Sequence, residues 1–309
     1  MSRNFEENVR HDFERARQRA FLHDLLAVFA RHPNDLIPYH EVRRRVSPEG
    51  ESYRGHQTVR IDQIVGSMDR FHDFDRAFFP RKRFTADRWQ NVDRAYYQDV
   101  RLPPIQLYKV GDVYFVKDGN HRVSVAREKG QEFIDAEVIE GHIRVPFYPS
   151  MAPDELLLQA EYAGFLRRTD LDKLRPDHDI RPTALGRYDE IWEHIEGHRR
   201  WLEAIRHHPV SVHDAVADWY EYIYQPIVTV ARERGITDRF PNRTEADIYL
   251  WVVRHRGELE RQLGHDVGPA ASAADYAENV RPPSAWRAAL DGLRARWPFG
   301  RRVAGQTGD

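Results

Sequence analysis

The sequence predicts an α+β protein, with a small mixed-sheet domain and its flanking helices followed by an all-helical domain. Short runs rich in β-branched and aromatic residues, at 105–109 and 113–116, alternate with helical patterns in the first half of the chain. From residue 186 onward, apolar residues recur at three- and four-residue spacing, which is typical of helices.

Composition excludes several classes of protein. The chain has no cysteine, so disulfides, thiolate zinc sites and thiol nucleophiles are excluded. Its formal net charge is -2, so no overall positive field attracts nucleic acid. The sequence contains no run of 18 apolar residues, the length that a membrane-spanning helix requires. The charged N-terminus is not a signal peptide. We therefore expect a cytoplasmic protein of bacterial type.

The 309 residues are enough for two ordinary domains. Shifts in composition divide the chain into a helical N-terminal segment, a sheet domain, a linker or arm, a helical domain and a disordered tail. The expected boundaries are 1–50, 51–150, 151–185, 186–299 and 300–309.

Periodicity predicts the helices of the first half. An amphipathic pattern covers residues 4–31, and shorter helices are predicted over 39–46 and 86–97. Arg81-Lys82-Arg83 lies beside aromatic residues in this region. Such a cluster either binds single-stranded nucleic acid or belongs to a helix whose aromatic residues face the core.

The chemistry is expected where a strand meets a helix, at Asp118-Gly119. Gly119 allows a tight turn and the close approach of a ligand. Asn120 is the predicted N-cap of a helix that ends at Gly130. The helix N-terminus offers unpaired N–H groups to an anion, and Arg122 in its first turn is unfavourable unless an anion lies nearby. The alternative is an ordinary β-turn with a solvated arginine.

This region resembles the ParB/sulfiredoxin fold. Pro104-Ile105, the turn at 119–122, Ala126 and Gly130 follow the order of the ParB pattern of Pro-Ile strand, arginine-rich turn, helix and strand. ParB has Glu-Arg where this chain has Asn120-His121. The turn sequence Asp-Gly-Asn-His-Arg is closer to the Asp-Gly-His-His-Arg turn of the ParB-like free-serine kinases.

A second stretch, Thr58 to Asp75, resembles the first part of the ParB domain, where a strand precedes a loop that carries an arginine. The resemblance covers roughly residues 55–145. It implies a nucleotide-binding protein that uses ATP or CTP with Mg²⁺. The sulfiredoxin reaction is excluded because it needs a cysteine.

The first functional hypothesis is a nucleoside-triphosphate-dependent phosphotransferase or hydrolase that acts on a small-molecule acceptor or water. Asp118 would hold Mg²⁺, and His121 would stabilise charge or move a proton. Asp69 is a candidate base. The expected catalytic residues are thus Asp118, His121 and Asp69, and the expected phosphate ligands are Gly119, Asn120, His121, Arg122, Arg70 and Ser67.

The alternative is a nucleotide-gated module of ParB type that binds DNA or a partner, as a homodimer or a monomer, without metabolic catalysis. A third hypothesis, a ParB-like nuclease, lacks a sufficient carboxylate cluster. A helix-turn-helix is readable after Ala231, but its second helix carries Glu245 and Asp247 in the first turn. We therefore expect no specific binding of duplex DNA by this chain alone.

The C-terminal half is predicted to contain helices over 188–206, 212–224 and 226–233, and a fourth from Thr244 to Gly264. His194 and His198 either share a metal or lie on a solvated helix face. The segment from Phe240 to Arg256 resembles the helical domain that follows the ParB-like unit in a family of uncharacterised bacterial proteins.

Overall fold

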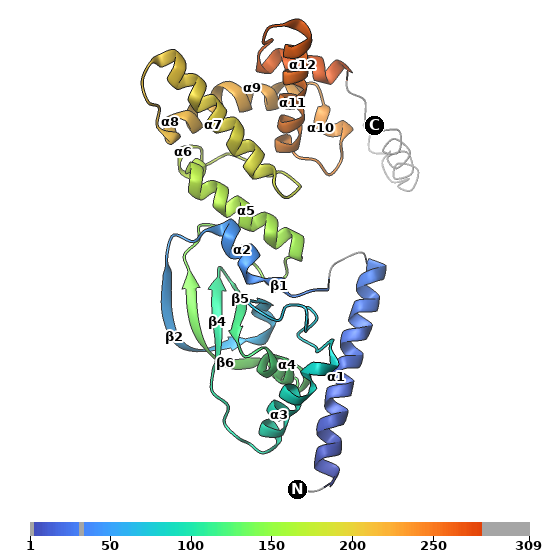
Figure 1. The fold of residues 1–309 in the computed structure, drawn as a ribbon. Helices are drawn as coiled ribbons and strands as arrows, with labels where there is room; N and C mark the ends of the chain where they lie inside the picture. Colours follow the sequence, from blue (N-terminus) through green and yellow to red (C-terminus); the bar gives the residue numbers. More distant parts are fainter. Residues whose placement is uncertain (1–2, 31–33, 280–309) are drawn as a thin grey trace, which may run out of the picture. The chain divides into compact units, whose positions relative to one another are not determined.

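The computed structural model describes residues 3–30 and 34–279, and the chain divides into two compact units, residues 1–168 and 169–309 (Figure 1). The first unit contains a six-stranded mixed sheet with helices, and the second is helical where it is described. The predicted fold class is therefore confirmed. None of the helices in the described ranges has the length and apolar character that crossing a membrane requires. The tail predicted from residue 300 lies outside the described residues.

The sheet has the strand order β1-β3-β5-β4-β6-β2. Strands β3 and β5 are parallel, so their carboxyl ends lie at the same edge of the sheet. Strands β4 and β5 contain the two runs expected to be strands and pair as a hairpin whose turn is Gly111-Asp112, a typical turn dipeptide. The strand bounds are β1 (Ile37–Pro38), β2 (Glu51–Arg60), β3 (Ile64–Ser67), β4 (Ile105–Val110), β5 (Val113–Asp118) and β6 (Phe133–Gly141).

Helix α4 (Asn120–Glu128) begins directly after β5. Gly119 occupies the N-cap position with a φ of 112°, so the prediction of Asn120 as N-cap is wrong by one residue. A Cβ at Gly119 would lie 2.4 Å from Cγ2 of Ile105, so only glycine fits the close approach of the turn to β4. The helix ends as predicted, with Gly130 at a φ of 72°.

Three other helices of the first unit agree with the predicted positions, and a fourth, α5, lies in the segment 151–185 that was expected to be a linker or arm. They are α1 (Arg3–Ala30), α2 (Tyr39–Val46), α3 (Ala86–Tyr97) and α5 (Pro153–Thr169). Figure 1 shows α2 and α5 at one end of the sheet and α3 and α4 at the other. Apolar side chains of α1, α3 and α4 share one core cluster, which contains Phe13, Ala16, Ala20, Phe79, Trp89 and Val125.

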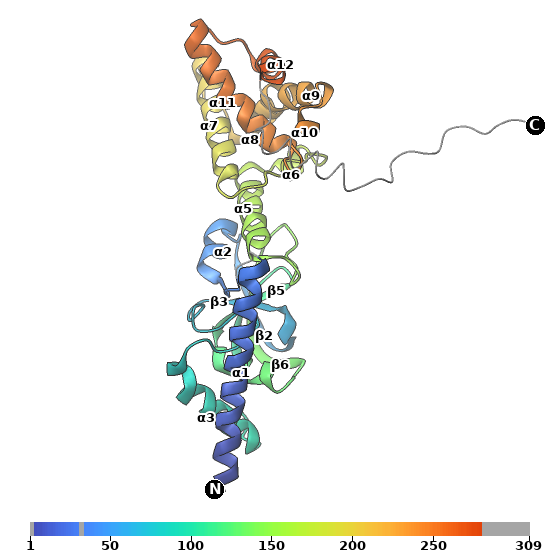
Figure 2. The same cartoon turned by 90° about the vertical axis from the view of Figure 1, so that its right-hand side faces the viewer.

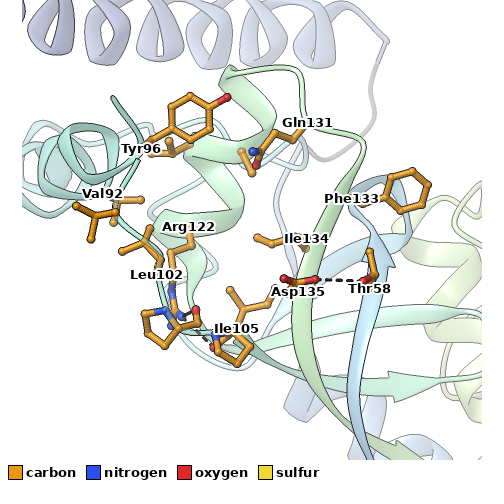
Figure 3. A pocket seen from close by; sticks show the side chains of 15 residues that line it. Thr58, Val92, Tyr96, Leu102, Ile105, Arg122, Gln131, Phe133, Ile134 and Asp135 are labelled. Carbon is orange, nitrogen blue, oxygen red and sulfur yellow. Dashed lines mark hydrogen bonds between the residues drawn. The ribbon is translucent and has the colours of Figure 1, made fainter. Parts of the chain in front are cut away.

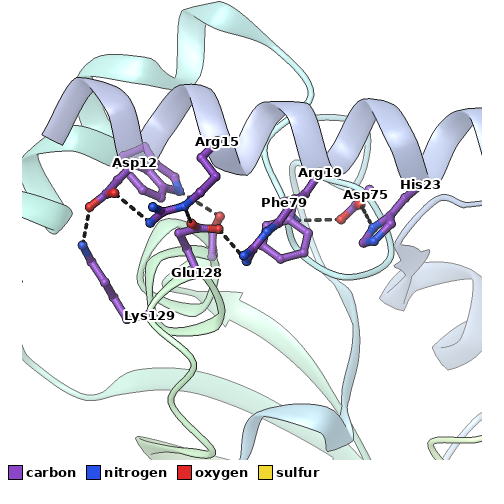
Figure 4. Close-up of polar contacts among 10 residues, drawn as sticks. Asp12, Arg15, Arg19, His23, Asp75, Phe79, Glu128 and Lys129 are labelled. Atoms are coloured by element: carbon purple, nitrogen blue, oxygen red, sulfur yellow. Dashed lines mark hydrogen bonds and ion pairs between the residues drawn. The ribbon is translucent and has the colours of Figure 1, made fainter. Parts of the chain in front are cut away.

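Helix α1 runs along α3 in both views (Figure 1, Figure 2) and is also held by ion pairs (Figure 4). Lys129, just after α4, lies 2.6 Å from Oδ2 of Asp12 and 2.8 Å from Oδ1 of Asp93 on α3. Arg15 of α1 lies 2.5 Å from the buried carboxylate of Glu128. These contacts tie the carboxyl end of α4 to α1 and α3, so the amino end of α4 is fixed in place.

The four helices predicted for the second unit are present, with one difference in how they are divided, and three further helices in its described part were not predicted. The predicted helices 212–224 and 226–233 form a continuous helix joined by a π-helical turn, η3 (Tyr220–Tyr224). Pro226 lacks an N–H group, and the wider π turn accommodates it. The bounds are α6 (Leu171–Leu174), α7 (Arg187–Arg206), α8 (Val212–Trp219), α9 (Gln225–Glu233), α10 (Ile236–Arg239), α11 (Glu245–Leu263) and α12 (Pro269–Asn279).

The start of α11 has the predicted capping box. The side chain of Thr244 accepts a hydrogen bond from the backbone N–H of Asp247, whose carboxylate accepts one from the backbone N–H of Thr244. Glu245 forms an ion pair of 2.8 Å with Arg232. The carboxylates in the first turn of α11 are thus paired within the protein.

We predict that Lys129→Met lowers the free energy of unfolding by about 3–5 kcal/mol, because it leaves the fully buried carboxylate of Asp93 without its cation. Burial already raises the pKa of Asp93, so this carboxyl is expected to protonate in the variant. Lys109→Met is the control, since it removes a more exposed ion pair with Glu140 and is expected to cost about 1 kcal/mol or less. Urea unfolding measures both. Equal losses would contradict the role given to Lys129.

Candidate functional site

A cavity of about 380 Å³ lies where β3 and β5 end and α4 begins. Open sheets with helices commonly bind ligands at such a position, beyond the carboxyl ends of parallel strands. The cavity brings together most of the predicted site residues with others from α3. Its lining consists of Asp69, Arg70, Arg88, Asn91, Val92, Lys117, Asp118, Gly119, Asn120, His121 and Arg122.

Ser67 is the predicted phosphate ligand that does not line this cavity. Its side chain is fully buried, and its hydroxyl lies 2.5 Å from the carbonyl oxygen of Asp69 and 3.2 Å from that of Val116. The hydroxyl therefore fixes the loop after β3 against β5. Arg70 follows in this loop with a positive φ of 59°, which is uncommon for a residue with a side chain.

Arg122 makes several contacts within the protein. Its Nη1 donates to the carbonyl oxygens of Pro103 at 2.5 Å and Pro104 at 2.9 Å, and its Nη2 forms an ion pair with Asp118. The side chain is 16 % exposed, so the alternative of a solvated arginine is wrong. Asp118 supplies the anion that a cation in the first turn of a helix requires. Arg122 thus holds the turn against the segment that leads into β4.

Asn120 and His121 bring buried polar atoms to the cavity. Asn120 is 7 % exposed, and its Oδ1 has no hydrogen-bond partner in the described part of the protein. Both ring nitrogens of His121 are buried and lack a partner within the same residues. Buried polar atoms in proteins are nearly always hydrogen-bonded. A ligand or water would have to supply the partners of these three atoms.

The imidazole of His121 is neutral at pH 7. Burial lowers its pKa to about 4, and the positive charges of Arg70 and Arg88 contribute to this. The ring packs edge-on against Phe74, with the ring centroids 5.3 Å apart. A neutral imidazole offers one donor and one acceptor, so it is able to take up a proton during a reaction.

Sequence reasoning missed four residues of the cavity. Arg88, Asn91 and Val92 come from α3, and Lys117 comes from the end of β5. Among the lining residues, four cationic side chains face two anionic ones, and His121 adds no charge. The cavity therefore favours an anion. The only sequence signal for Arg88 was its place on a predicted helix, which did not show that this helix faces the turn.

A second cavity, of about 360 Å³, lies beside the first and shares Arg122 and Val92 with it (Figure 3). Its lining is mainly apolar, and polar groups lie along part of its edge. Thr58 donates a hydrogen bond of 3.1 Å to Asp135 there. Such a cavity suits a flat, largely apolar group with polar edges. Other lining residues include Tyr96, Leu102, Ile105, Val125, Gln131, Phe133 and Ile134.

The basic and aromatic segment after residue 80 agrees only in part with either interpretation. Trp89 is fully buried, as expected for a core-facing aromatic residue, but Tyr96 and Tyr97 are 42 % and 44 % exposed. Arg81 forms ion pairs with Asp24 and Asp35. Much of the basic charge of this segment is therefore neutralised inside the protein.

The two C-terminal histidines do not share a ligand. His194 lies 3.1 Å from the hydroxyl of Tyr249, and His198 lies 2.7 Å from Asp218. Within residues 3–30 and 34–279, no group of three or more His, Cys, Asp or Glu side chains is arranged to hold a metal. The histidine pair therefore serves the packing of the second unit.

We predict that His121 makes stability depend on pH. The ordinary pKa of 6.5 applies in the unfolded chain, whereas folding lowers it to about 4. Because the unfolded chain binds the proton more readily, the free energy of unfolding is highest above pH 6.5. It falls by about 2–3 kcal/mol as pH decreases toward 4. His121→Phe should lack this loss. Urea unfolding of both proteins between pH 7 and pH 4 tests it, and parallel pH profiles would contradict the neutral imidazole.

No protein-family model matches this chain, and no curated protein matches it in sequence. The assignment of the site therefore depends on its geometry and chemistry.

Proposed function

We propose that the first unit binds a nucleoside triphosphate, ATP or CTP, with its phosphates at the turn of residues 118–122. The main support is the excess of positive charge in the cavity at the amino end of α4. The unpartnered N–H of neutral His121 would donate to a phosphate oxygen, and Oδ1 of Asn120 would accept from a hydroxyl group or a water molecule of the ligand. The resemblance to the ParB/sulfiredoxin fold supports the same ligand at the same turn.

The amino end of α4 provides the phosphate-binding groups. The first N–H groups of a helix have no partner inside the helix, and here they belong to Asn120, His121 and Arg122. They lie beside a cavity with an excess of positive charge. Together with the partial positive charge of the helix end, this arrangement binds phosphate oxygens. Gly119 allows the turn to pack against Ile105, which holds these N–H groups at the cavity.

The nucleoside is proposed to occupy the second cavity. Arg122 lines both cavities. A ligand whose phosphates lie in the first cavity would therefore extend along the protein surface into the second cavity. Apolar side chains such as Ile105 and Ile134 would contact the flat base. Asp135 and Gln131 would meet its polar edge.

The carboxylates of the cavity fit a magnesium ion bound together with phosphates. Asp118 is 68 % exposed and pairs with Arg122 through one of its oxygens, which leaves the other oxygen free. Asp69 lines the same cavity. Mg²⁺ in nucleotide sites is usually held by one or two carboxylates and by phosphate oxygens. When bound, the ion would neutralise charge on the phosphates.

The proposed reaction is phosphoryl transfer to a small acceptor, or to water. The catalytic contribution of the protein would be positioning and charge stabilisation at the transferred phosphoryl group. Neutral His121 would accept or donate a proton, and Asp69 would act as base toward the acceptor hydroxyl. The same cavity would also serve a nucleotide-gated module that binds a partner or a second copy without turnover. Release of phosphate from the nucleotide distinguishes the two.

We predict that the protein binds ATP or CTP more tightly with Mg²⁺ than with a chelator, and that Asp118→Asn loses this difference. The loss of a charge-assisted interaction is expected to weaken binding with Mg²⁺ by about ten- to a hundred-fold. Asp112→Asn, in the hairpin turn, is a control with the same change of charge. Calorimetric titration of the three proteins tests the proposal. Absence of nucleotide binding by the parent protein would overturn it.

A further inference from the structure

The cations of the first cavity differ in how far the protein already neutralises them. Arg122 is engaged by Asp118 and by two carbonyl oxygens, and Arg70 lies 3.4 Å from Asp73. Arg88 and Lys117 also line the cavity, but neither has a carboxylate partner within the described residues. The Nζ of Lys117 lies 5.6 Å from the ring centroid of Tyr108, so Arg88 is the lining cation most available to a ligand.

Arg88 is presented by a helix that is firmly attached to α4. Trp89, the next residue, donates a hydrogen bond of 2.9 Å from Nε1 to Oγ of Ser124, and both side chains are fully buried. Asp93, further along α3, is paired with Lys129. The backbone of Arg88 is therefore held opposite the turn between β5 and α4. Arg88 is near enough to His121 to lower its pKa.

A buried polar group marks a ligand position between α3 and the turn that joins β5 to α4. Asn120 is more than nine-tenths buried and lines the cavity, and its Oδ1 lacks a partner among the described residues. The ring nitrogens of His121 are unpartnered beside it. Neither group is satisfied by the cations, because Arg88 and Lys117 make no hydrogen bond to them. A phosphate chain that reaches from the turn to α3 would pair with the cations and with the one N–H of neutral His121, whereas Oδ1 of Asn120, which only accepts, would pair with a hydroxyl group or a water molecule of the ligand.

We propose that Arg88, with Lys117, binds the phosphate chain of the ligand, and that Arg122 mainly positions the turn. This inference rests on the proposed function for the identity of the ligand as a nucleotide. A chain of two or more phosphates would extend from the turn before α4 to Arg88 on α3, whereas a single phosphate would occupy the turn alone. Arg88 therefore makes the site selective for di- and triphosphates over monophosphates. Its planar guanidinium binds two phosphate oxygens at once.

The test compares Arg88→Ala and Arg88→Lys with the parent protein. ATP with Mg²⁺, AMP and inorganic tripolyphosphate are titrated by calorimetry, and the ligand-free proteins are melted. Arg88→Ala is expected to weaken binding of ATP and tripolyphosphate by about ten- to a hundred-fold and to leave AMP binding and the melting temperature unchanged. Arg88→Lys should restore part of the affinity. Arg83→Ala is the control, because this exposed arginine lies just before α3 and outside the cavity lining.

The outcomes separate this inference from the proposed function. If the parent binds ATP and Arg88→Ala binds it equally well, the role of Arg88 is overturned and the nucleotide site stands. If the parent binds tripolyphosphate but no nucleotide, and Arg88→Ala loses this binding, the phosphate site stands and the nucleotide assignment fails. Equal losses for ATP and AMP, or a lower melting temperature in Arg88→Ala, would show a structural role. A parent protein that binds none of the three ligands would overturn both proposals.

Discussion

The close packing of the β5–α4 turn against β4 is the constraint on which the candidate site depends. Gly119 leaves no room for a Cβ beside Ile105, and Arg122 bonds to the carbonyl oxygens of Pro103 and Pro104. The turn is thereby held at the edge where β3 also ends. This packing directs the amino end of α4, with Asn120 and His121, into the cavity.

The unpartnered polar atoms of the candidate site destabilise the folded protein. Each buried donor or acceptor without a partner costs about 1–3 kcal/mol, and Asn120 and His121 bring three such atoms into one cavity. The positive φ of Arg70 adds backbone strain in the facing loop. The rest of the unit offsets these costs through its two apolar cores and the ion pairs of Lys129.

Local patterns predicted much of this arrangement, and long-range packing decided the rest. The hairpin at Gly111-Asp112, helix α3 and the Gly130 end of α4 follow from turn residues and periodicity. Gly119 as the N-cap could not be predicted, because its conformation depends on a contact with Ile105, which is distant in sequence. The place of Arg88 in the cavity could not be predicted for the same reason. Its function depends on which face of α3 meets the turn, and the hydrogen bond between Trp89 and Ser124 sets that face.

The most direct test of the phosphate site is hydrogen–deuterium exchange of the backbone amides at the amino end of α4. With saturating Mg²⁺ and ATP or CTP, the amides of residues 120–122 should exchange more slowly, because phosphate oxygens would accept their hydrogen bonds. The hairpin turn at 111–112 should show no change. Unchanged exchange at residues 120–122 in the presence of bound nucleotide, or protection confined to the second unit, would contradict the assignment of this turn as the phosphate-binding element.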